Sequence, residues 1–237
     1  MSVAALEAEF GVSPMTARRD LQILEREGRA RRTHGGAVAA TLALDEDAFQ
    51  SRLGDHADAK RKLGQAAADR IEEGETVFVD CSTTAYYAVR SLVHSGKAVT
   101  VLTPSVSVMD LIARSDAPQV ELLGLAGSLR RLTCSFVGPQ TVRAIQDHFA
   151  DKLLFSVKGL APGNVLTDAN PLEAEVKRTM IERARESILL IDGSKFDHAG
   201  LSAIAPIAAV DTVLVTGGEP AQVRALADSG VRFEEIA

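Results

Sequence analysis

The sequence predicts an α/β fold with a mostly parallel sheet, preceded by a small helical unit at the N-terminus. Short apolar runs recur through the larger part of the chain, at 76–80, 98–103, 119–125, 152–157, 187–191 and 212–216. Amphipathic segments lie between most of them, at 60–72, 84–94, 105–115, 172–185 and 219–229. Continuous apolar strands that alternate with helices are typical of a parallel sheet covered on both faces.

Length and composition fit a globular protein with one large domain and one small domain. The chain has 237 residues, of which 46% are hydrophobic, and no apolar run approaches the roughly 20 residues needed to span a bilayer. The opening residues include acids where a secretory signal would be basic and then apolar. Two cysteines, Cys81 and Cys134, lack metal-ligand spacing, as in reduced cysteines of the cytoplasm. We therefore expect a cytoplasmic protein that needs no metal or cofactor.

Charge is distributed unevenly along the chain. Residues 1–36 carry six arginines and five acids, a net charge of +1, whereas the rest of the chain carries −7. The arginines cluster between residues 18 and 32, close to His34. A compact basic segment on an acidic protein indicates contact with a polyanion, although a solvated helix face is the alternative.

The N-terminal segment is predicted to form two helices and a β-hairpin. A short helix is expected at 3–10 and a second over 14–27, because Ser13 can cap free N–H groups and Pro14 suits the first helical position. The inward positions of the second helix are Ala17, Leu21 and Leu24.

A glycine and a pair of glycines punctuate the end of this segment. Gly28 is expected to end the second helix as a left-handed cap, and 29–38 to form two short strands around a turn at Gly35–Gly36. Residues 39–56 lack clear periodicity and are interpreted as a linker.

A short helix, a glycine-containing turn and a second helix fit the helix-turn-helix unit, whose second helix enters the major groove of DNA. Arginine can pair bidentately with guanine, and a basic hairpin can contact the phosphate backbone as a wing. The expected DNA-contacting residues are Ser13, Met15, Thr16, Arg18, Arg19, Gln22, Arg29, Arg31, Arg32 and His34. Any two packed helices can produce this generic pattern, so the spacing alone leaves DNA binding open.

Polar residues follow several of the predicted strands. Residues 80–84 (DCSTT) lie where a strand ends and a helix begins, and a helix N-terminus presents free N–H groups to an anion. Two other strand ends, at 103–105 and 124–127, are small, polar or glycine-containing. Together they predict a ligand cleft at one edge of the sheet, although ordinary helix capping also explains such residues.

Lys195, which follows the strand at 187–191, is the expected cation for a phosphate group, and Lys158 could assist it. Glu173 and Lys177 are one helical turn apart, so an i,i+4 surface pair is an alternative interpretation for them. The predicted ligand-binding residues are Asp80, Ser82, Thr83, Thr84, Thr103, Ser105, Gly127, Lys158, Asp168, Glu173 and Lys195.

The N-terminal residues closely resemble the signature of the DeoR family of transcriptional regulators. That signature has a Val-Ser, a Thr, an Arg-Arg-Asp-Leu run, a Leu-Glu, a Gly and an Arg-x-His-Gly-Gly wing. Here it corresponds to Val12–Ser13, Thr16, Arg18–Leu21, Leu24–Glu25, Gly28 and Arg32–Gly36. Ala17 departs from the pattern, since the family usually has a larger aliphatic residue there.

The rest of the chain resembles the effector domain of the same family. Ser135–Gly138 and Asp192–Phe196 match its Ser-Phe-x-Gly and Asp-x-Ser-Lys-Phe motifs. Three positions depart: Ser82 replaces a loop glycine, Pro104 replaces an asparagine, and Ala126 replaces the first of two glycines. We expect the phosphate site to survive and the sugar selectivity to differ.

The resemblance implies a winged helix-turn-helix head at 1–38, a linker at 39–56 and a sugar-phosphate-binding domain at 57–237. That domain would have a Rossmann-like fold similar to ribose-5-phosphate isomerases and coenzyme A transferases. The implied function is a DNA-binding regulator, normally a repressor of sugar catabolism genes, whose operator binding responds to a phosphorylated sugar. A homodimer or homotetramer is expected, since palindromic operators match two-fold symmetric proteins.

Two other functions were weighed against this one. A sugar-phosphate isomerase would need a carboxylate base, for which Asp80, Asp168, Glu173 and Asp192 are candidates, but no paired-acid loop accompanies a glycine-rich strand end. A DNA-binding head also suits a sensor better than a metabolic enzyme. The third possibility is a DNA-binding protein whose body only oligomerises.

The head also resembles a family that has a further helix ahead of the point matching Val3. Without that helix, Leu6, Phe10 and Leu21 would lose part of their burial, and a fully buried large apolar side chain is worth about 1.5–3 kcal/mol. We therefore expect residues 1–36 to be mobile or packed on another chain, and this chain to bind its operator weakly.

Overall fold

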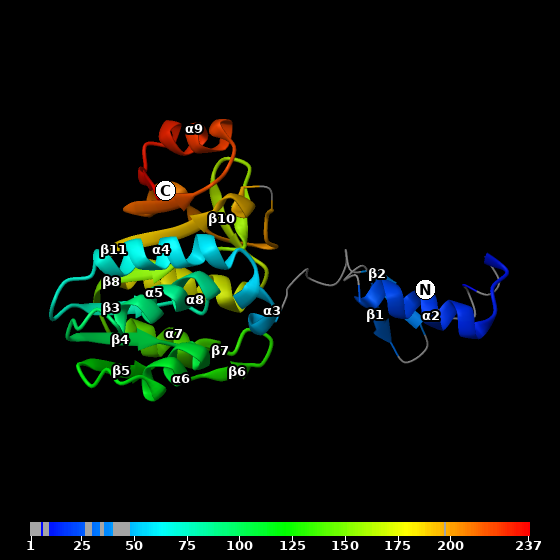
Figure 1. Cartoon of the computed structure of the whole chain (residues 1–237), viewed down its shortest axis with the longest axis horizontal. Coiled ribbons are helices and arrows are strands. Elements are labelled where there is room, and N and C mark those ends of the chain that lie inside the picture. The colour runs from blue at the N-terminus through cyan, green and yellow to red at the C-terminus, as the bar shows by residue number, and fades with distance from the viewer. Residues whose placement is uncertain (1–5, 7–9, 27–29, 34–35, 40–47, 197) are drawn as a thin grey trace. The chain divides into compact units, whose positions relative to one another are not determined.

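The computed structural model describes residues 6, 10–26, 30–33, 36–39, 48–196 and 198–237 (Figure 1). The chain divides into two units, a head spanning Met1–Glu46 and a body spanning Asp47–Ala237. None of the helices within these described ranges is long and apolar enough to cross a membrane.

The head contains the predicted second helix and both predicted strands. Helix α2 (Pro14–Arg26) begins where expected, because the Ser13 hydroxyl accepts a hydrogen bond from the Thr16 N–H at 3.2 Å. Ala17 is 2% exposed and Leu21 is also buried, as their helical spacing predicts. Strands β1 (Ala30–Thr33) and β2 (Gly36–Ala39) pair in antiparallel fashion. This confirms the helix and the hairpin strands.

Several details predicted for the head lie outside the described residues. They include the Gly28 cap, the first turn residue Gly35, and all of the helix at 3–10 except Leu6 and Phe10, which are helical. Phe10 is largely exposed.

The body is built on a seven-stranded sheet in the order β14-β13-β11-β8-β3-β4-β5, with every neighbouring pair parallel. Its strands span Thr76–Val79 (β3), Val99–Thr103 (β4), Val120–Gly124 (β5), Ala150–Phe155 (β8), Ala184–Asp192 (β11), Thr212–Thr216 (β13) and Arg232–Glu235 (β14). The α/β class and the parallel sheet are thus confirmed. All six predicted apolar runs form strands of this sheet.

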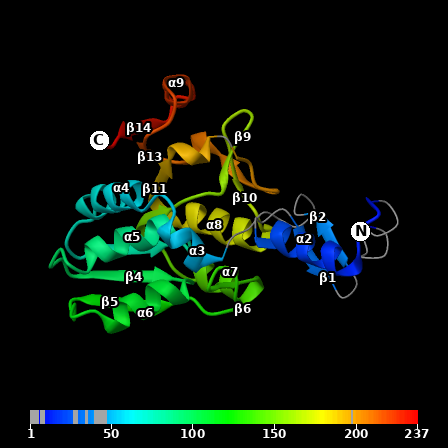
Figure 2. The ribbon, with the colours of Figure 1, turned by 45° about the vertical axis from the view of Figure 1, so that its right-hand side comes forward.

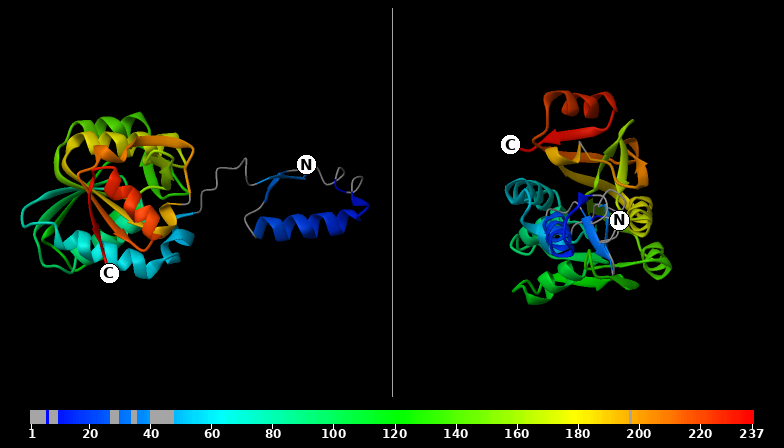
Figure 3. Two further views of the ribbon diagram at one scale, coloured as in Figure 1. Left: turned by 90° about the horizontal axis from the view of Figure 1, so that it is seen from above. Right: turned by 90° about the vertical axis from the view of Figure 1, so that its right-hand side faces the viewer.

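Helices cover both faces of the sheet, as Figure 3 shows. One face packs against α4 (Ala57–Asp69), α5 (Thr83–Leu92) and α6 (Val106–Arg114), and the other against α7 (Pro139–Gln146), α8 (Pro171–Arg183) and α9 (Pro220–Asp228). Successive strand residues point to opposite faces of the sheet and so pack into two separate hydrophobic cores. Val77 and Val79 pack with α4 and α5, whereas Phe78 packs in the core on the opposite face. This double burial explains why the strands are continuously apolar.

Short elements that the sequence pattern did not predict gather at one end of the body. They are the hairpin β6 (Ser128–Arg130) and β7 (Ser135–Val137), the antiparallel sheet of β9 (Gly159–Ala161), β10 (Val165–Asp168) and β12 (Ser202–Pro206), and the 3-10 turns at Gly193–Lys195 and Ile207–Ala209. Figure 2 shows β6 and β10 at the same end of the body as α3.

Helix α3 (Phe49–Gly54) corrects the expected linker at 39–56. Its first residue, Phe49, is buried, packs edge-to-face on Tyr86 with ring centroids 5.7 Å apart, and donates its N–H to the Leu132 carbonyl at 2.9 Å. The Tyr87 hydroxyl donates to the Leu53 carbonyl at 3.2 Å. Residues 49–54 are therefore part of the body, because one aromatic anchor and two hydrogen bonds fold them back onto it.

Candidate functional site

The turn after β3 is organised by Asp80, which is fully buried. Its Oδ1 accepts hydrogen bonds from the Ser82 N–H at 3.0 Å and the Ser82 hydroxyl at 2.6 Å. Its Oδ2 accepts from the Ser156 N–H at 3.3 Å and lies 3.3 Å from the Lys177 Nζ. Asp80 therefore joins the ends of β3 and β8 to α8, and its oxygens already have protein partners.

The N-terminus of α5 lies directly after this turn. The Ser82 hydroxyl accepts the Ala85 N–H at 3.1 Å, so Ser82 is the N-cap, as the capping alternative proposed. Thr83 and Thr84 follow, both buried in the first turn. The first N–H groups of a helix have no partners within it and carry partial positive charge, which suits an anion at this point.

Lys177 lies inside the body, which corrects its interpretation as part of a surface pair with Glu173. Its Nζ donates to Asp168 Oδ2 at 2.7 Å and to the Ser156 carbonyl at 2.8 Å. Burial opposes the Lys177 charge, but Asp168 and Asp80 outweigh it and raise the lysine's pKa. Burial also disfavours the charge of Asp168, yet Lys177 holds that pKa below its usual value.

Glu173 belongs to a second buried cluster on the same helix. Its Oε1 accepts hydrogen bonds from the Thr133 hydroxyl at 2.7 Å and the Ser135 hydroxyl at 2.6 Å, with Arg130 Nη1 3.9 Å away. Burial raises the pKa of Glu173 despite these bonds, and burial likewise raises the pKa of the Cys81 thiol. Thr133 was not among the predicted ligand-binding residues.

Two further strand ends reach the same edge of the sheet. The Thr103 hydroxyl donates to the Val79 carbonyl at 2.7 Å and accepts from the Ser105 N–H at 3.0 Å. Ser105 then caps α6, accepting the Val108 N–H at 3.3 Å. A Cβ on Gly127 would lie 1.9 Å from the Thr141 Oγ1, so packing against α7 requires glycine there. These residues shape the edge through structural contacts of their own.

Lys195 follows the end of β11 and is partly buried. Burial lowers its pKa, and the positive charges of Lys158 and Arg52 add to that effect against the opposing carboxylate of Asp192. Asp192 Oδ1 accepts from the Ser194 N–H, while its Oδ2 is buried without a hydrogen-bond partner. Within the described ranges the Lys195 ammonium donates no hydrogen bond and forms no ion pair, so Asp192 offsets its burial only in part.

Two cations near Lys195 were missed by the sequence analysis. Lys60 is 4% exposed, its Nζ donates to the Arg52 carbonyl, and burial together with Lys195 lowers its pKa to about 8. Arg52, on α3, has its Nε and Nη2 buried without partners. Lys60 could have been noticed, because it shares the buried face of α4 with Leu63, Gly64 and Ala67. Arg52 could not, because its segment lacks periodicity.

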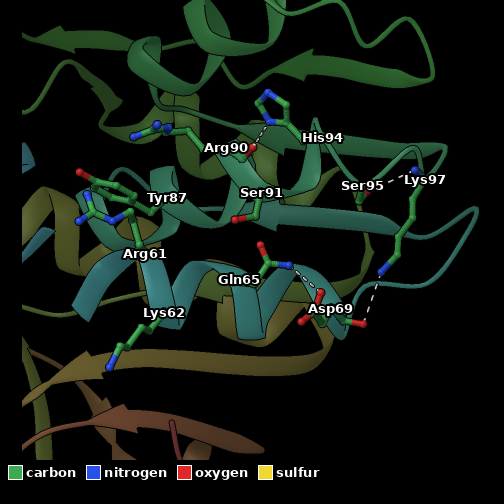
Figure 4. Close-up of a pocket in the computed structure, with 10 residues that line it drawn as sticks. All are labelled: Arg61, Lys62, Gln65, Asp69, Tyr87, Arg90, Ser91, His94, Ser95 and Lys97. Atoms are coloured by element: carbon green, nitrogen blue, oxygen red, sulfur yellow. Dashed lines mark hydrogen bonds between the residues drawn. The ribbon is translucent and has the colours of Figure 1, made fainter. Parts of the chain in front are cut away.

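A groove on the outer side of α4 and α5 is a second place where cations gather (Figure 4). Three of these cations have partners: Arg61 pairs with Asp58, Lys97 donates to the Ala68 and Ile71 carbonyls, and Arg90 stacks on Tyr87, 5.1 Å from the ring centroid. The groove is therefore a weaker candidate for an anion site than the buried cations at the carboxyl ends of the strands.

The predicted DNA-contacting face of α2 is exposed. Met15 is 81% exposed, and Arg18, Arg19, Gln22 and Ser13 are also exposed, whereas Thr16 is partly covered. Arg19 lies 3.8 Å from Asp20, an exposed pair that leaves the guanidinium accessible. In the predicted wing, Arg31 and Arg32 lie on β1, while Arg29 and His34 are outside the described residues.

Comparison with known proteins matches both units to one family. Residues 1–42 match the DeoR-like helix-turn-helix domain and residues 55–217 the DeoR C terminal sensor domain. The HTH-type transcriptional regulator YulB of Bacillus subtilis is 32% identical over 99% of this chain and 90% of its own length. The repressor GlcR of B. subtilis is 31% identical (89% and 80%), and the L-fucose operon activator of Escherichia coli 30% identical (84% and 82%).

Among solved structures, ribose 5-phosphate isomerase A of Methanocaldococcus jannaschii aligns with a TM-score of 0.44 at 15% identity, over 60% of this chain and 55% of that chain. The two family matches together span most of the sequence. They include helix α2 in the head and the strand ends that form the candidate site in the body. The chain therefore belongs to the DeoR family of DNA-binding transcriptional regulators, which are not enzymes.

Proposed function

We propose that the body binds the phosphate group of a phosphorylated sugar at the carboxyl ends of β3, β8 and β11. We further propose that this binding changes the affinity of the head for an operator, and that the chain represses sugar catabolism genes. GlcR supports repression, since it is named a repressor, whereas the L-fucose operon activator of E. coli supports only the control of a sugar operon.

The observation that carries the proposal is the concentration of buried positive charge around Lys195, which carboxylates offset only in part. Burial lowers the pKa of Lys195 and Lys60, and Arg52 adds a guanidinium with unpartnered nitrogens. Asp192 opposes the shift of both lysines and Asp55 also opposes that of Lys60, whereas Asp80 and Asp168 pair with Lys177. A dianion would relieve this excess, and the N-terminus of α5 would add hydrogen-bond donors.

A thermal-shift screen of phosphorylated sugars, each beside its unphosphorylated form, tests the proposal. A phosphorylated ligand at about 100 times its dissociation constant stabilises the folded chain by roughly 2.7 kcal/mol. The free sugar should give no shift at the same concentration. Equal shifts from both forms would reject a site centred on phosphate.

The remaining predicted ligand residues fall into two groups in this proposal. Thr83, Thr84, Lys158 and Lys195 would contact the ligand directly. Asp80, Ser82, Thr103, Ser105, Gly127, Asp168 and Glu173 would shape the site through the contacts described above. Asp80 and Asp168 both form buried ion pairs with Lys177, so neither carboxylate is free to take a proton from a substrate. This argues against the isomerase alternative.

The head is proposed to read its operator through Arg18 and Arg19. Replacing either with alanine should weaken specific binding by about 1–3 kcal/mol, because each guanidinium can make a bidentate base contact. Replacing Arg31 or Arg32 should instead weaken binding to all DNA and flatten its salt dependence. Fluorescence-anisotropy titrations at several salt concentrations separate the two effects, and unchanged operator affinity in both α2 variants would reject the groove assignment.

We propose that the chain acts in the cytoplasm as a homodimer or homotetramer. The support is indirect: a regulator must reach DNA, and two-fold symmetric proteins match palindromic operators. Sedimentation of the full chain measures this state directly.

A further inference from the structure

We propose that Arg52 binds the anionic group of the effector directly, so that occupation of the site fixes helix α3 to the edge of the sheet. The inference rests on the proposed function and adds the residue through which binding reaches the head. It concerns α3 because the body begins at Asp47, and α3 is its first helix after the head.

The guanidinium of Arg52 offers a complete binding edge. Its Nε and Nη2 are both buried without a hydrogen-bond partner, and across the described ranges Asp192 Oδ2 is the only other buried side-chain polar atom in that condition. Nε and Nη2 form one side of the planar fork, which is the side that grips two oxygens of a phosphate or carboxylate. Burying N–H donors without hydrogen-bond partners costs free energy. We therefore expect a ligand with two acceptor oxygens to bind at this edge.

The charges around Arg52 select an anion as that occupant. The Lys60 Nζ donates to the Arg52 carbonyl, and the positive charge of Arg52 helps to lower the pKa of Lys195. Among the described residues Arg52 forms no ion pair, and Asp168, whose pKa it helps to lower, makes its close pair with Lys177. Asp192 acts on Lys195 and Lys60, and Asp55 also acts on Lys60, but neither carboxylate forms an ion pair with the three cations in the described part of the chain. A dianion with oxygens for Arg52 and Lys195 would supply such partners.

The position of Arg52 makes α3 responsive to the ligand. The helix spans Phe49–Gly54, too short to be stable in isolation, and depends on contacts with the body. Those contacts are the buried Phe49 ring, its N–H on the Leu132 carbonyl and the Tyr87 hydroxyl on the Leu53 carbonyl. A bidentate contact through Arg52 would add a ligand-dependent anchor, which is the differential interaction that coupling to the head requires.

The test compares Arg52→Gln with Arg61→Gln in the full chain. Arg61 is the matched control, an exposed arginine paired with Asp58 on the outer side of α4. The probes are inorganic phosphate, sulfate and the panel of phosphorylated sugars, with affinity measured by calorimetry and amide exchange measured over residues 49–54. We expect the probes to slow exchange there, and Arg52→Gln to weaken affinity at least tenfold, or about 1.4 kcal/mol. Arg61→Gln should behave like the parent.

The outcomes separate this inference from the proposed function. Parental affinity in Arg52→Gln, with exchange at 49–54 unaffected by the probes, overturns the role of Arg52 and leaves the phosphate site standing. Arg52-dependent binding of phosphate and sulfate without any response to phosphorylated sugars upholds Arg52 and overturns the proposed effector. If no probe binds, both are rejected. Should Arg52→Gln misfold, Arg52→Lys keeps the charge without the fork, and undiminished affinity in that variant contradicts bidentate binding.

Discussion

Replacing Lys177 with methionine should lower the free energy of unfolding by about 3–5 kcal/mol, because the change leaves two buried carboxylates without their shared cation. Lys177 lies 2.7 Å from Asp168 Oδ2 and 3.3 Å from Asp80 Oδ2, and its Nζ also donates to the Ser156 carbonyl. These contacts join β3, β8, β10 and α8. Urea denaturation of parent and variant measures the loss.

The pH dependence of that loss follows from the same pair. In the parent, Lys177 holds the pKa of Asp168 below its usual value, so the pair stabilises the fold near neutral pH and weakens as acid protonates the carboxylate. In the variant, Asp168 lacks the cation that lowers its pKa and takes up a proton more readily. The difference in unfolding free energy should therefore shrink from neutral pH to mild acid.

Arg114→Met supplies the matched control for Lys177. Arg114 Nε lies 2.6 Å from Asp110 Oδ1, but the two side chains are 79% and 58% exposed. An exposed pair of this kind contributes at most about 1 kcal/mol. Equal losses in the two variants would show that burial of Lys177 does not have the importance assigned to it.

Replacing Lys195 with glutamine should remove most of the ligand response while leaving the fold intact. Losing one partner of a desolvated charge pair costs about 2–5 kcal/mol of binding, a weakening of roughly thirtyfold or more. The unliganded variant should be at least as stable as the parent, because burial and neighbouring cations already disfavour the Lys195 charge. Such a trade of stability for function is common at binding sites.

Calorimetry with a phosphorylated sugar and thermal unfolding without ligand measure the two effects of Lys195→Gln separately. Lys97→Gln is its control, because Lys97 is a lysine with carbonyl partners away from the proposed site. A large fall in unliganded stability for Lys195→Gln would indicate a structural role for this lysine. Unchanged affinity would remove it from the site.

The centre of the sheet could be predicted because its strands β3, β4, β8, β11 and β13 are buried on both faces. The run at 212–216 became β13 with the same bounds, since a strand between two helix layers must be continuously apolar. Strands β9, β10 and β12 escaped prediction because they are short, and the pairing of β10 with β12 joins residues far apart in sequence. The helix at 49–54 was not predicted either, because the buried Phe49 ring and hydrogen bonds to residues far along the chain stabilise it.

The candidate site was predictable where a motif follows a strand, as at Asp80–Thr84 and Lys195. It was not predictable where charge is buried by tertiary packing. Lys177 and Glu173 have the spacing of a surface pair, yet α8 packs against β7, β8, β10, β11 and β12, and both side chains are buried. Arg52 reaches the site only because α3 folds back onto the body, which no local pattern encodes.

Operator titration by the full chain at fixed salt, with and without the phosphorylated sugar that gives the largest thermal shift, tests the central claim most directly. The claim predicts that this ligand changes operator affinity by about fivefold or more, within the usual range of coupling between two sites. It also predicts that Lys195→Gln binds operator like the parent but no longer responds to the ligand. Operator binding that is identical with and without every phosphorylated sugar that stabilises the body would contradict it.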